Sequence, residues 1–189
     1  MKYNYLQHMM AERIALSPEA VRNGSLLAQR MLLDSAEFAA AHTVALYSPI
    51  RNEVETDELF RVALALGKKV LFPAVAGQSL VFRVVQCHAD LERGAFGILE
   101  PKESCRSVDP GEAAMIVVPG VAFDVHGRRI GYGKGFYDKT LHRLEGCGSL
   151  VGICYQFQLL EEIVAEPHDV LMDTIVTEQR WVRCHVPPH

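Results

Sequence analysis

The chain has 189 residues, of which 49% are hydrophobic, 22% charged and 8% aromatic, and its formal net charge is −4. This composition is typical of one globular domain and excludes a disordered chain. The weakly acidic balance, without a run of basic residues, argues against a protein that binds nucleic acid or a membrane surface. The five cysteines are an odd number without a C-x-x-C pair, which disfavours a disulfide framework and a zinc cluster. We expect these cysteines to be reduced and mostly buried.

The first 40 residues predict two helices before any strand. Apolar residues recur at helical spacing from Leu6 to Ile14, and Ser17 followed by Pro18 predicts the N-cap and first position of a second helix over 20–33. No apolar run near the first residue resembles a signal segment or a membrane span. The sequence therefore predicts a cytoplasmic protein.

Strands and helices are expected to alternate after residue 42. Strands are predicted over 43–47, 69–72 and 80–85, and a helix from Thr56 to about residue 67. The runs 114–118 and 150–155 are apolar at every position, which is typical of strands covered on both faces. A helix from about Gly135 to Leu144 lies between these two runs, so they predict a parallel βαβ unit.

The predicted fold class is α/β, with one domain over residues 1–189. We expect a three-layer, open, mainly parallel sheet with helices on both faces, and edge strands over 173–177 and 181–184. Ligands of such sheets bind beyond the carboxyl ends of the strands. That rule selects residues 48–55, 119–137 and 156–173 as candidate site segments.

The densest of these segments contains glycines at alternate positions, Gly131, Gly133 and Gly135, with Lys134 among them and a helix following. Backbone N–H groups of such a loop can approach a polyphosphate closely. Lys134 would contact phosphate as a point charge and Arg129 through its planar guanidinium. The loop is neither a Walker A loop, because no Ser or Thr follows Lys134, nor a dinucleotide fingerprint. A glycine-rich surface turn with a solvated lysine is the alternative.

Carboxylates near these segments are candidate metal and substrate ligands. Asp138, one turn into the helix, is a candidate magnesium ligand. His168, Asp169 and Asp173 form a second constellation of magnesium-type ligands, although His168 and Asp169 are also typical of a plain turn. Glu53 is a candidate acceptor for the N–H groups of a ring such as a pterin, whereas the neighbouring Glu55 is explained equally well as a solvated residue.

Motifs along nearly the whole chain together resemble a known family. They are residues 52–56 (NEVET), 96–101 (FGILEP), 119–124 (PGVAFD), 131–138 (GYGKGFYD) and 167–173 (PHDVLMD), the last followed by Thr177 and Glu178. Their order and spacing resemble the 5-formyltetrahydrofolate cyclo-ligase family, also called methenyltetrahydrofolate synthetase. Each motif alone is a weak signal, but all of them in register are specific.

The resemblance implies an ATP- and Mg²⁺-dependent closure of 5-formyltetrahydrofolate to 5,10-methenyltetrahydrofolate. The γ-phosphoryl group of ATP is transferred to the formyl oxygen, and folate N10 then closes the ring as phosphate leaves. No protein nucleophile is needed, so such an enzyme acts by in-line positioning and by neutralising charge.

The resemblance also assigns roles to residues of this chain. The catalytic residues would be Lys134 and Arg129, and the ATP-binding residues Lys2, Arg129, Gly131, Tyr132, Gly133, Lys134, Gly135, Phe136 and Tyr137. The folate would lie against Ser48, Glu53, Tyr132, Gly133, Lys134, Gly135 and Phe136. Magnesium, the implied cofactor, would be held by Asp138 and Asp173. The expected partners are the two small-molecule substrates alone, without nucleic acid or membrane, for a monomer or weak homodimer.

Two departures from the family pattern leave alternatives open. Family members usually begin with a Lys-x-x-Leu-Arg pattern that reaches ATP; Lys2 fits it, but Leu6 occupies the arginine position. The loss of one such contact weakens the ATP interaction roughly ten- to hundred-fold. Phe96 and Phe136 stand where the family often has tryptophan and tyrosine. The alternatives are a folate- or nucleotide-binding protein that has lost turnover, and an ATP-dependent ligase or kinase for another heterocycle.

Overall fold

The computed structural model describes residues 2–184, with side chains throughout this range except at residues 2–4 and Ala95. Its α-helices are α1 (Lys2–Ile14), α2 (Pro18–Leu33), α3 (Ala36–Ala40), α4 (Asp57–Ala65) and α5 (Phe136–His142). Its longer strands are β1 (Thr43–Ala45), β2 (Lys69–Ala76), β3 (Ser79–Val84), β7 (Met115–Val118), β10 (Ser149–Ile153), β12 (Thr174–Val176) and β13 (Trp181–Arg183). The shorter ones are β4 (Leu91–Arg93), β5 (Leu99–Pro101), β6 (Ser107–Val108), β8 (Ala122–Asp124), β9 (Arg129–Ile130) and β11 (Leu159–Leu160).

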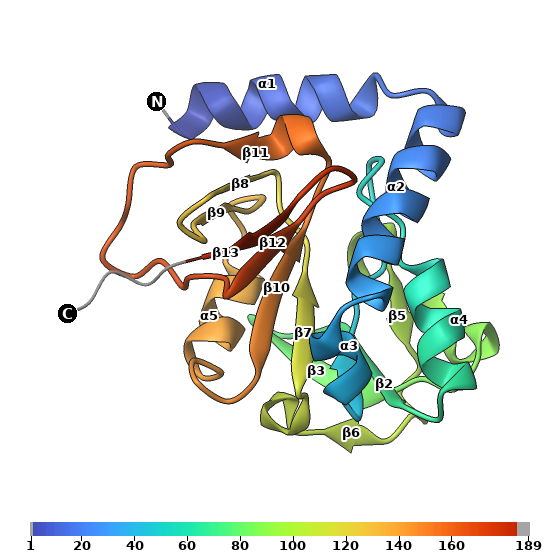
Figure 1. The fold of residues 1–189 in the computed structure, drawn as a ribbon. Helices are drawn as coiled ribbons and strands as arrows, with labels where there is room; N and C mark the ends of the chain where they lie inside the picture. The colour runs from blue at the N-terminus through green and yellow to red at the C-terminus, as the bar shows by residue number, and fades with distance from the viewer. Residues whose placement is uncertain (1, 185–189) are drawn as a thin grey trace.

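A mainly parallel sheet forms the centre of the molecule (Figure 1). Within residues 2–184 it has eight strands in the order β13-β12-β10-β7-β1-β2-β3-β6. The strands from β12 to β2 pair in parallel, and the outer strands β13, β3 and β6 pair antiparallel. β7 and β10 are parallel neighbours, as their uninterrupted apolar runs predicted. The predicted α/β fold class is confirmed, and β13 is an edge strand as expected. β12 was also expected at an edge but lies inside the sheet, because it pairs with β10 on one side and β13 on the other.

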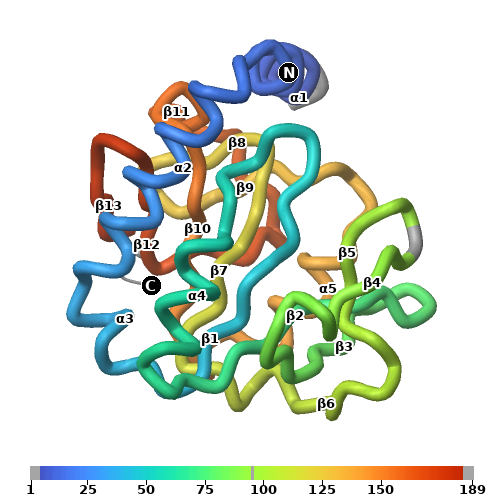
Figure 2. Tube along the Cα trace, turned by 90° about the vertical axis from the view of Figure 1, so that its right-hand side faces the viewer, coloured from blue at the N-terminus to red at the C-terminus, as the bar shows by residue number. Residues whose placement is uncertain are grey.

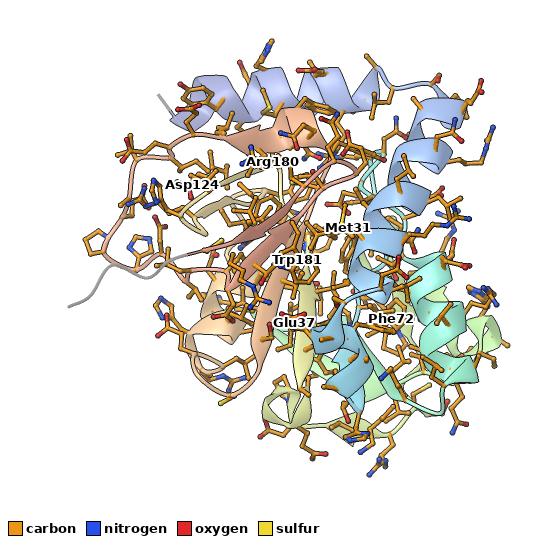
Figure 3. The ribbon with its side chains drawn as sticks, in the orientation of Figure 1. Met31, Glu37, Phe72, Asp124, Arg180 and Trp181 are labelled. Carbon is orange, nitrogen blue, oxygen red and sulfur yellow. The ribbon has the colours of Figure 1, made fainter. Side chains whose placement is uncertain are left out.

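Successive side chains of the buried strands point to opposite faces of this sheet, so there are two cores, one on each face. Met115 and Val117 of β7 belong to the core under α2, α3 and α4, whereas Ile116 and Val118 face the opposite side. Figure 3 shows Met31, Phe72 and Trp181, which contribute to the first core from α2, β2 and β13. The second face carries α5 and the loops around it, so helices cover both faces as expected.

A second, three-stranded sheet of β11, β8 and β9 packs beside the main one and was not predicted. α1 lies across this small sheet (Figures 1 and 2), where Leu6 and Met9 contact Val121 and Ile130. Leu6, at the position where the resemblance led us to expect a basic residue, is therefore part of an apolar contact between α1 and the small sheet.

The β8–β9 hairpin is fixed by one close approach and one buried carboxylate. Phe123 lies directly over Gly152 of β10, where a Cβ would come within 2.5 Å of the phenyl ring. Asp124, labelled in Figure 3, is fully buried and accepts hydrogen bonds from the backbone N–H groups of His126, Arg128 and Ile163. These contacts hold the hairpin, and with it Arg129, in one position.

Helix signals read from the sequence are confirmed, whereas the expected burial of the cysteines is not. The Ser17 hydroxyl accepts a hydrogen bond from the N–H of Ala20, and Pro18 is the first residue of α2.

All five cysteines are unpaired, but only Cys154 is buried, because Cys87 and Cys147 lie in exposed loops outside the strands. Among residues 2–184, no helix has the length and apolar character that crossing a membrane requires.

Candidate functional site

A cavity of about 400 Å³ opens at the carboxyl ends of β1 and β7, where the predicted segments after these strands meet. The hairpin β4–β5, which lies beside β2 (Figure 2), adds a wall that the sequence did not predict. Residues 156–173 form the third predicted segment, and none of them lines the cavity. The site is therefore built from two of the three expected segments.

Most of the predicted site residues come together around this cavity. Those that line it are Ser48, Glu53, Arg129, Gly131, Tyr132, Gly133, Lys134, Gly135, Phe136, Tyr137 and Asp138. Lys2 begins α1, and its side chain lies outside the part of the chain that the structure describes. Among the residues to which the resemblance assigns a role and whose side chains the structure describes, Asp173 lies elsewhere.

Asp173 does not reach the cavity, contrary to the expectation that it shares a metal ion with Asp138. It directly precedes β12, which runs parallel to β10, so it lies at the amino ends of the strands. Its Oδ2 accepts a hydrogen bond from the N–H of Leu150 at the beginning of β10, with a donor–acceptor distance of 2.7 Å. The cavity lies at the opposite edge, so Asp173 stabilises the sheet rather than the site.

The glycine loop borders the cavity in a conformation that depends on two of its glycines. Gly133 and Gly135 have φ values of 82° and 69°, a left-handed region that side chains with a Cβ rarely adopt. Lys134, between them, is exposed, and its Nζ lies 3.4 Å from the centroid of the Phe96 ring. Phe96 also packs against Phe136, with ring centroids 6.2 Å apart. The lysine and two aromatic rings therefore form one side of the opening.

Arg129 and Asp138 form an ion pair at the base of the same loop. The Arg129 side chain is only 6% exposed, and its Nη1 donates to the carbonyl of Pro119. Its Nη2 lies 2.5 Å from Oδ1 of Asp138, whose side chain is 52% exposed. A buried guanidinium and an accessible carboxylate thus stand together at the edge of the cavity.

Glu53 is a buried carboxylate at the floor of the cavity. It is 4% exposed, and its two oxygens accept hydrogen bonds from the N–H of Ile50 at 2.9 Å and the hydroxyl of Tyr132 at 2.8 Å. Burial raises the pKa of Glu53, whereas the nearby Arg13 guanidinium and these two hydrogen bonds lower it. The cavity therefore combines a buried acidic group with the cationic loop.

Three charged residues beside Glu53 and the loop were missed by the sequence reasoning. Arg13 is 1% exposed and donates to the Tyr132 hydroxyl. Its burial could have been predicted from its position one helical turn after Met9 and Met10, on the apolar face of α1. Glu100 lines the cavity and accepts a hydrogen bond from the N–H of Val75. Arg51 also lines it, with its guanidinium 5.6 Å from the centroid of the Tyr132 ring.

Possible metal ligands in the described residues occur as one group of three outside the cavity. Glu166, His168 and Asp169 place ligand atoms within 4.8 Å of one another on an exposed loop. Asp169 accepts a hydrogen bond from the N–H of Glu166, which is the plain turn that the sequence allowed as an alternative. Among the carboxylates that were predicted to hold magnesium, Asp138 lines the cavity, and its side chain is accessible. One carboxylate suits Mg²⁺, which binds through one or two carboxylates together with phosphate oxygens and water.

Comparison with known proteins gives a consistent result along the chain. The model of the 5-formyltetrahydrofolate cyclo-ligase family matches residues 2–178. A 5-formyltetrahydrofolate cyclo-ligase of Mycolicibacterium smegmatis is 36% identical over 87% of this chain and 88% of its own length. The corresponding protein of Escherichia coli K12 is 30% identical over 89% of this chain and 95% of its own length.

A solved structure agrees with this result. The NMR structure of 5,10-methenyltetrahydrofolate synthetase from Aquifex aeolicus superposes with a TM-score of 0.89 at 37% identity, covering 100% of this chain and 95% of that one. The motif order, the fold and these relatives lead to one conclusion. The chain belongs to the 5-formyltetrahydrofolate cyclo-ligase family.

Proposed function

We propose that the protein catalyses the ATP-dependent conversion of 5-formyltetrahydrofolate to 5,10-methenyltetrahydrofolate. The observation that carries this proposal is the cavity in which the cationic glycine loop faces a buried carboxylate, in a chain of this family. A triphosphate and a heterocycle with N–H donors need these two kinds of surface within one site.

In this proposal the folate binds at the floor of the cavity, next to Glu53. The Glu53 carboxylate accepts one hydrogen bond on each oxygen within the protein, and each oxygen keeps a second lone pair for an N–H group of the pterin ring. Ser48 and Tyr132 line the same region. The positively charged Arg13 behind Tyr132 favours the ionised form of Glu53, which is the better acceptor.

In this proposal the triphosphate of ATP binds next to the glycine loop. Lys134 is exposed at the opening, and Arg129 is held by the Pro119 carbonyl with its guanidinium directed to the same edge. Because the protein carries a net charge of −4, attraction of an anionic nucleotide has to come from these local groups. Asp138 would hold the Mg²⁺ ion, which when bound neutralises charge on the phosphates.

The reaction needs positioning rather than a protein nucleophile. The formyl oxygen attacks the γ-phosphorus and ADP leaves; N10 then attacks the formyl carbon, the C–O bond to phosphate breaks, and the N10 proton is released. Lys134 and Arg129 stabilise the charge on the transferred group, while Glu53 fixes the pterin so that the formyl oxygen lies in line. The rings of Phe96 and Phe136 form one side of the opening next to Lys134.

An absorbance assay for methenyltetrahydrofolate tests the proposal. The purified protein with 5-formyltetrahydrofolate and ATP is expected to form the product in the presence of magnesium and not after chelation. Absence of product beside an active control enzyme would refute the proposed reaction.

A second candidate is a folate- or nucleotide-binding protein without turnover. It is favoured by Leu6, which packs against the small sheet where the family usually has a basic residue. Calorimetry separates the two functions, because the second predicts folate binding without ATP hydrolysis. ADP release that requires another heterocycle would indicate a ligase or kinase for that compound.

The cytoplasmic location, the monomeric or weakly dimeric state and the lack of nucleic-acid and membrane partners stay predictions. Five unpaired cysteines, two of them exposed, are compatible with a reducing compartment.

A further inference from the structure

A buried arginine, Arg13, links the end of α1 to the loop that carries Glu53. The Arg13 guanidinium directs its donors to three separate segments: Nε to the carbonyl of Arg51 at 3.0 Å, Nη1 to the carbonyl of Gly120 at 3.0 Å, and Nη2 to the Tyr132 hydroxyl. A guanidinium that is 1% exposed is costly to bury unless its donors are satisfied. The three acceptors therefore fix its position.

The turn before Glu53 has an uncommon backbone. Arg51 and Asn52 are consecutive residues with φ values of 49° and 59°, which non-glycine residues seldom adopt. The Asn52 amide donates towards the carbonyls of Arg13 and Ile14 at the end of α1 and of Leu16 just after it, over distances of 3.2 to 3.4 Å. Arg13 and Asn52 thus tie this turn to the helix from both sides, and the turn sets the direction of the next side chain, Glu53.

A second connection runs through the side chains. The Tyr132 hydroxyl accepts a hydrogen bond from Arg13 and donates its own proton to Oε1 of Glu53. The Tyr132 ring lies beside the guanidinium groups of Arg13 and Arg51, which are 5.7 and 5.6 Å from its centroid. Arg13 therefore determines both where the Tyr132 hydroxyl lies and which way its proton points.

We propose that Arg13 is a positioning residue for folate binding, which holds Glu53 in its binding orientation through the Arg51 carbonyl and the Tyr132 hydroxyl. The inference rests on the proposed function, in which Glu53 binds the pterin ring. Arg13 itself does not line the cavity, so it acts through these two contacts rather than by touching the substrate.

The test measures KM for each substrate, kcat and melting temperature in matched variants. Arg13→Gln is expected to raise KM for 5-formyltetrahydrofolate about ten-fold, as loss of a charge-assisted contact does, while KM for ATP changes less than about two-fold. Arg13→Lys keeps the charge but cannot reach all three acceptors, so it is expected to recover part of the loss. Arg22→Gln, on the exposed face of α2, makes the same charge change and is expected to leave every value unaltered.

A double-mutant cycle identifies the route. If Arg13 acts through the Tyr132 hydroxyl, the double variant Arg13→Gln/Tyr132→Phe is expected to raise KM for the folate by less than the product of the two single effects. Tyr132→Phe keeps the ring and its packing, so it reports on the hydroxyl even if Arg13→Gln does not fold.

Glu53→Gln separates failure of the inference from failure of the proposed function. An unchanged folate KM in Glu53→Gln would refute the role of Glu53 and, with it, the inference. A raised folate KM in Glu53→Gln together with unchanged values in Arg13→Gln and Tyr132→Phe would overturn the inference alone. Strictly multiplicative effects in the cycle, or an equal rise in KM for both substrates, would also overturn it.

Discussion

Arg129 and Asp138 form an ion pair, with 2.5 Å between Nη2 and Oδ1, that joins the two ends of the glycine loop. Arg129 precedes residues 131–135, and Asp138 follows them. The pair connects β9 to the first turn of α5. Arg129 is buried and held by the Pro119 carbonyl, so it fixes the position of the more exposed Asp138 carboxylate. This arrangement keeps one acidic and one basic group together at the place where a magnesium–nucleotide complex is proposed to bind.

Substitution of Asp138 is expected to change the magnesium requirement, whereas substitution of Asp173 is expected to change stability. In Asp138→Asn, the magnesium concentration for half-maximal activity should rise about ten-fold or more, because a neutral amide is a poor Mg²⁺ ligand. In Asp173→Ala, loss of the hydrogen bond to Leu150 should lower the free energy of unfolding by about 1 kcal/mol. Magnesium titrations and thermal melts of both variants check this pair. A shifted magnesium requirement in Asp173→Ala with none in Asp138→Asn would contradict it.

Lys134 is expected to matter for turnover and not for folding. Its side chain is exposed, and its described contact is the Phe96 ring, a cation–π interaction worth about 0.5–1 kcal/mol at such a site. Lys134→Ala should therefore reduce kcat at least about ten-fold with little change in melting temperature. Lys139→Ala is the matched control, because Lys139 lies on α5, which follows the glycine loop, and contacts Gln78 rather than the cavity. A lower melting temperature with unchanged specific activity would argue against a role in phosphate binding.

The parts of the fold that the sequence predicted are those that depend on local pattern. The apolar runs of β7 and β10 indicated buried parallel strands, and Ser17 with Pro18 indicated the beginning of α2. β4, β5, β8, β9 and β11 are three residues long or shorter, so their pairing depends on tertiary contacts that no local pattern encodes. The position of Phe96 at the opening follows from the β4–β5 hairpin and was therefore not predictable.

Predicted site residues that follow a strand line the cavity, whereas one that precedes a strand does not. Glu53 and Arg129 come after β1 and β7 and lie at the cavity. Asp173 comes before β12, so a parallel sheet places it at the other edge, although its motif is close to the chain's last strands. Arg13 was missed because burial of a charged side chain on α1 depends on acceptors about 40 to 120 residues away in the sequence.

The buried Glu53 is expected to make stability depend on pH in a direction that can be measured. Burial raises its pKa above the ordinary value of 4.5, more than Arg13 lowers it, so the folded protein holds this proton more tightly than the unfolded chain. The contribution of Glu53 to the free energy of unfolding is therefore fully present below pH 4.5 and is lost as the pH rises through the raised pKa.

Glu53→Gln removes this dependence, because the neutral amide stands in for the protonated carboxyl at every pH. The free energy of unfolding of Glu53→Gln, minus that of the unsubstituted protein, should increase as the pH rises above 4.5. Urea unfolding at a series of pH values measures this difference, and Glu92→Gln, at an exposed position of β4, controls for the change in net charge. A difference that decreases as the pH rises would mean that Arg13 outweighs burial and that the pKa of Glu53 lies below its ordinary value.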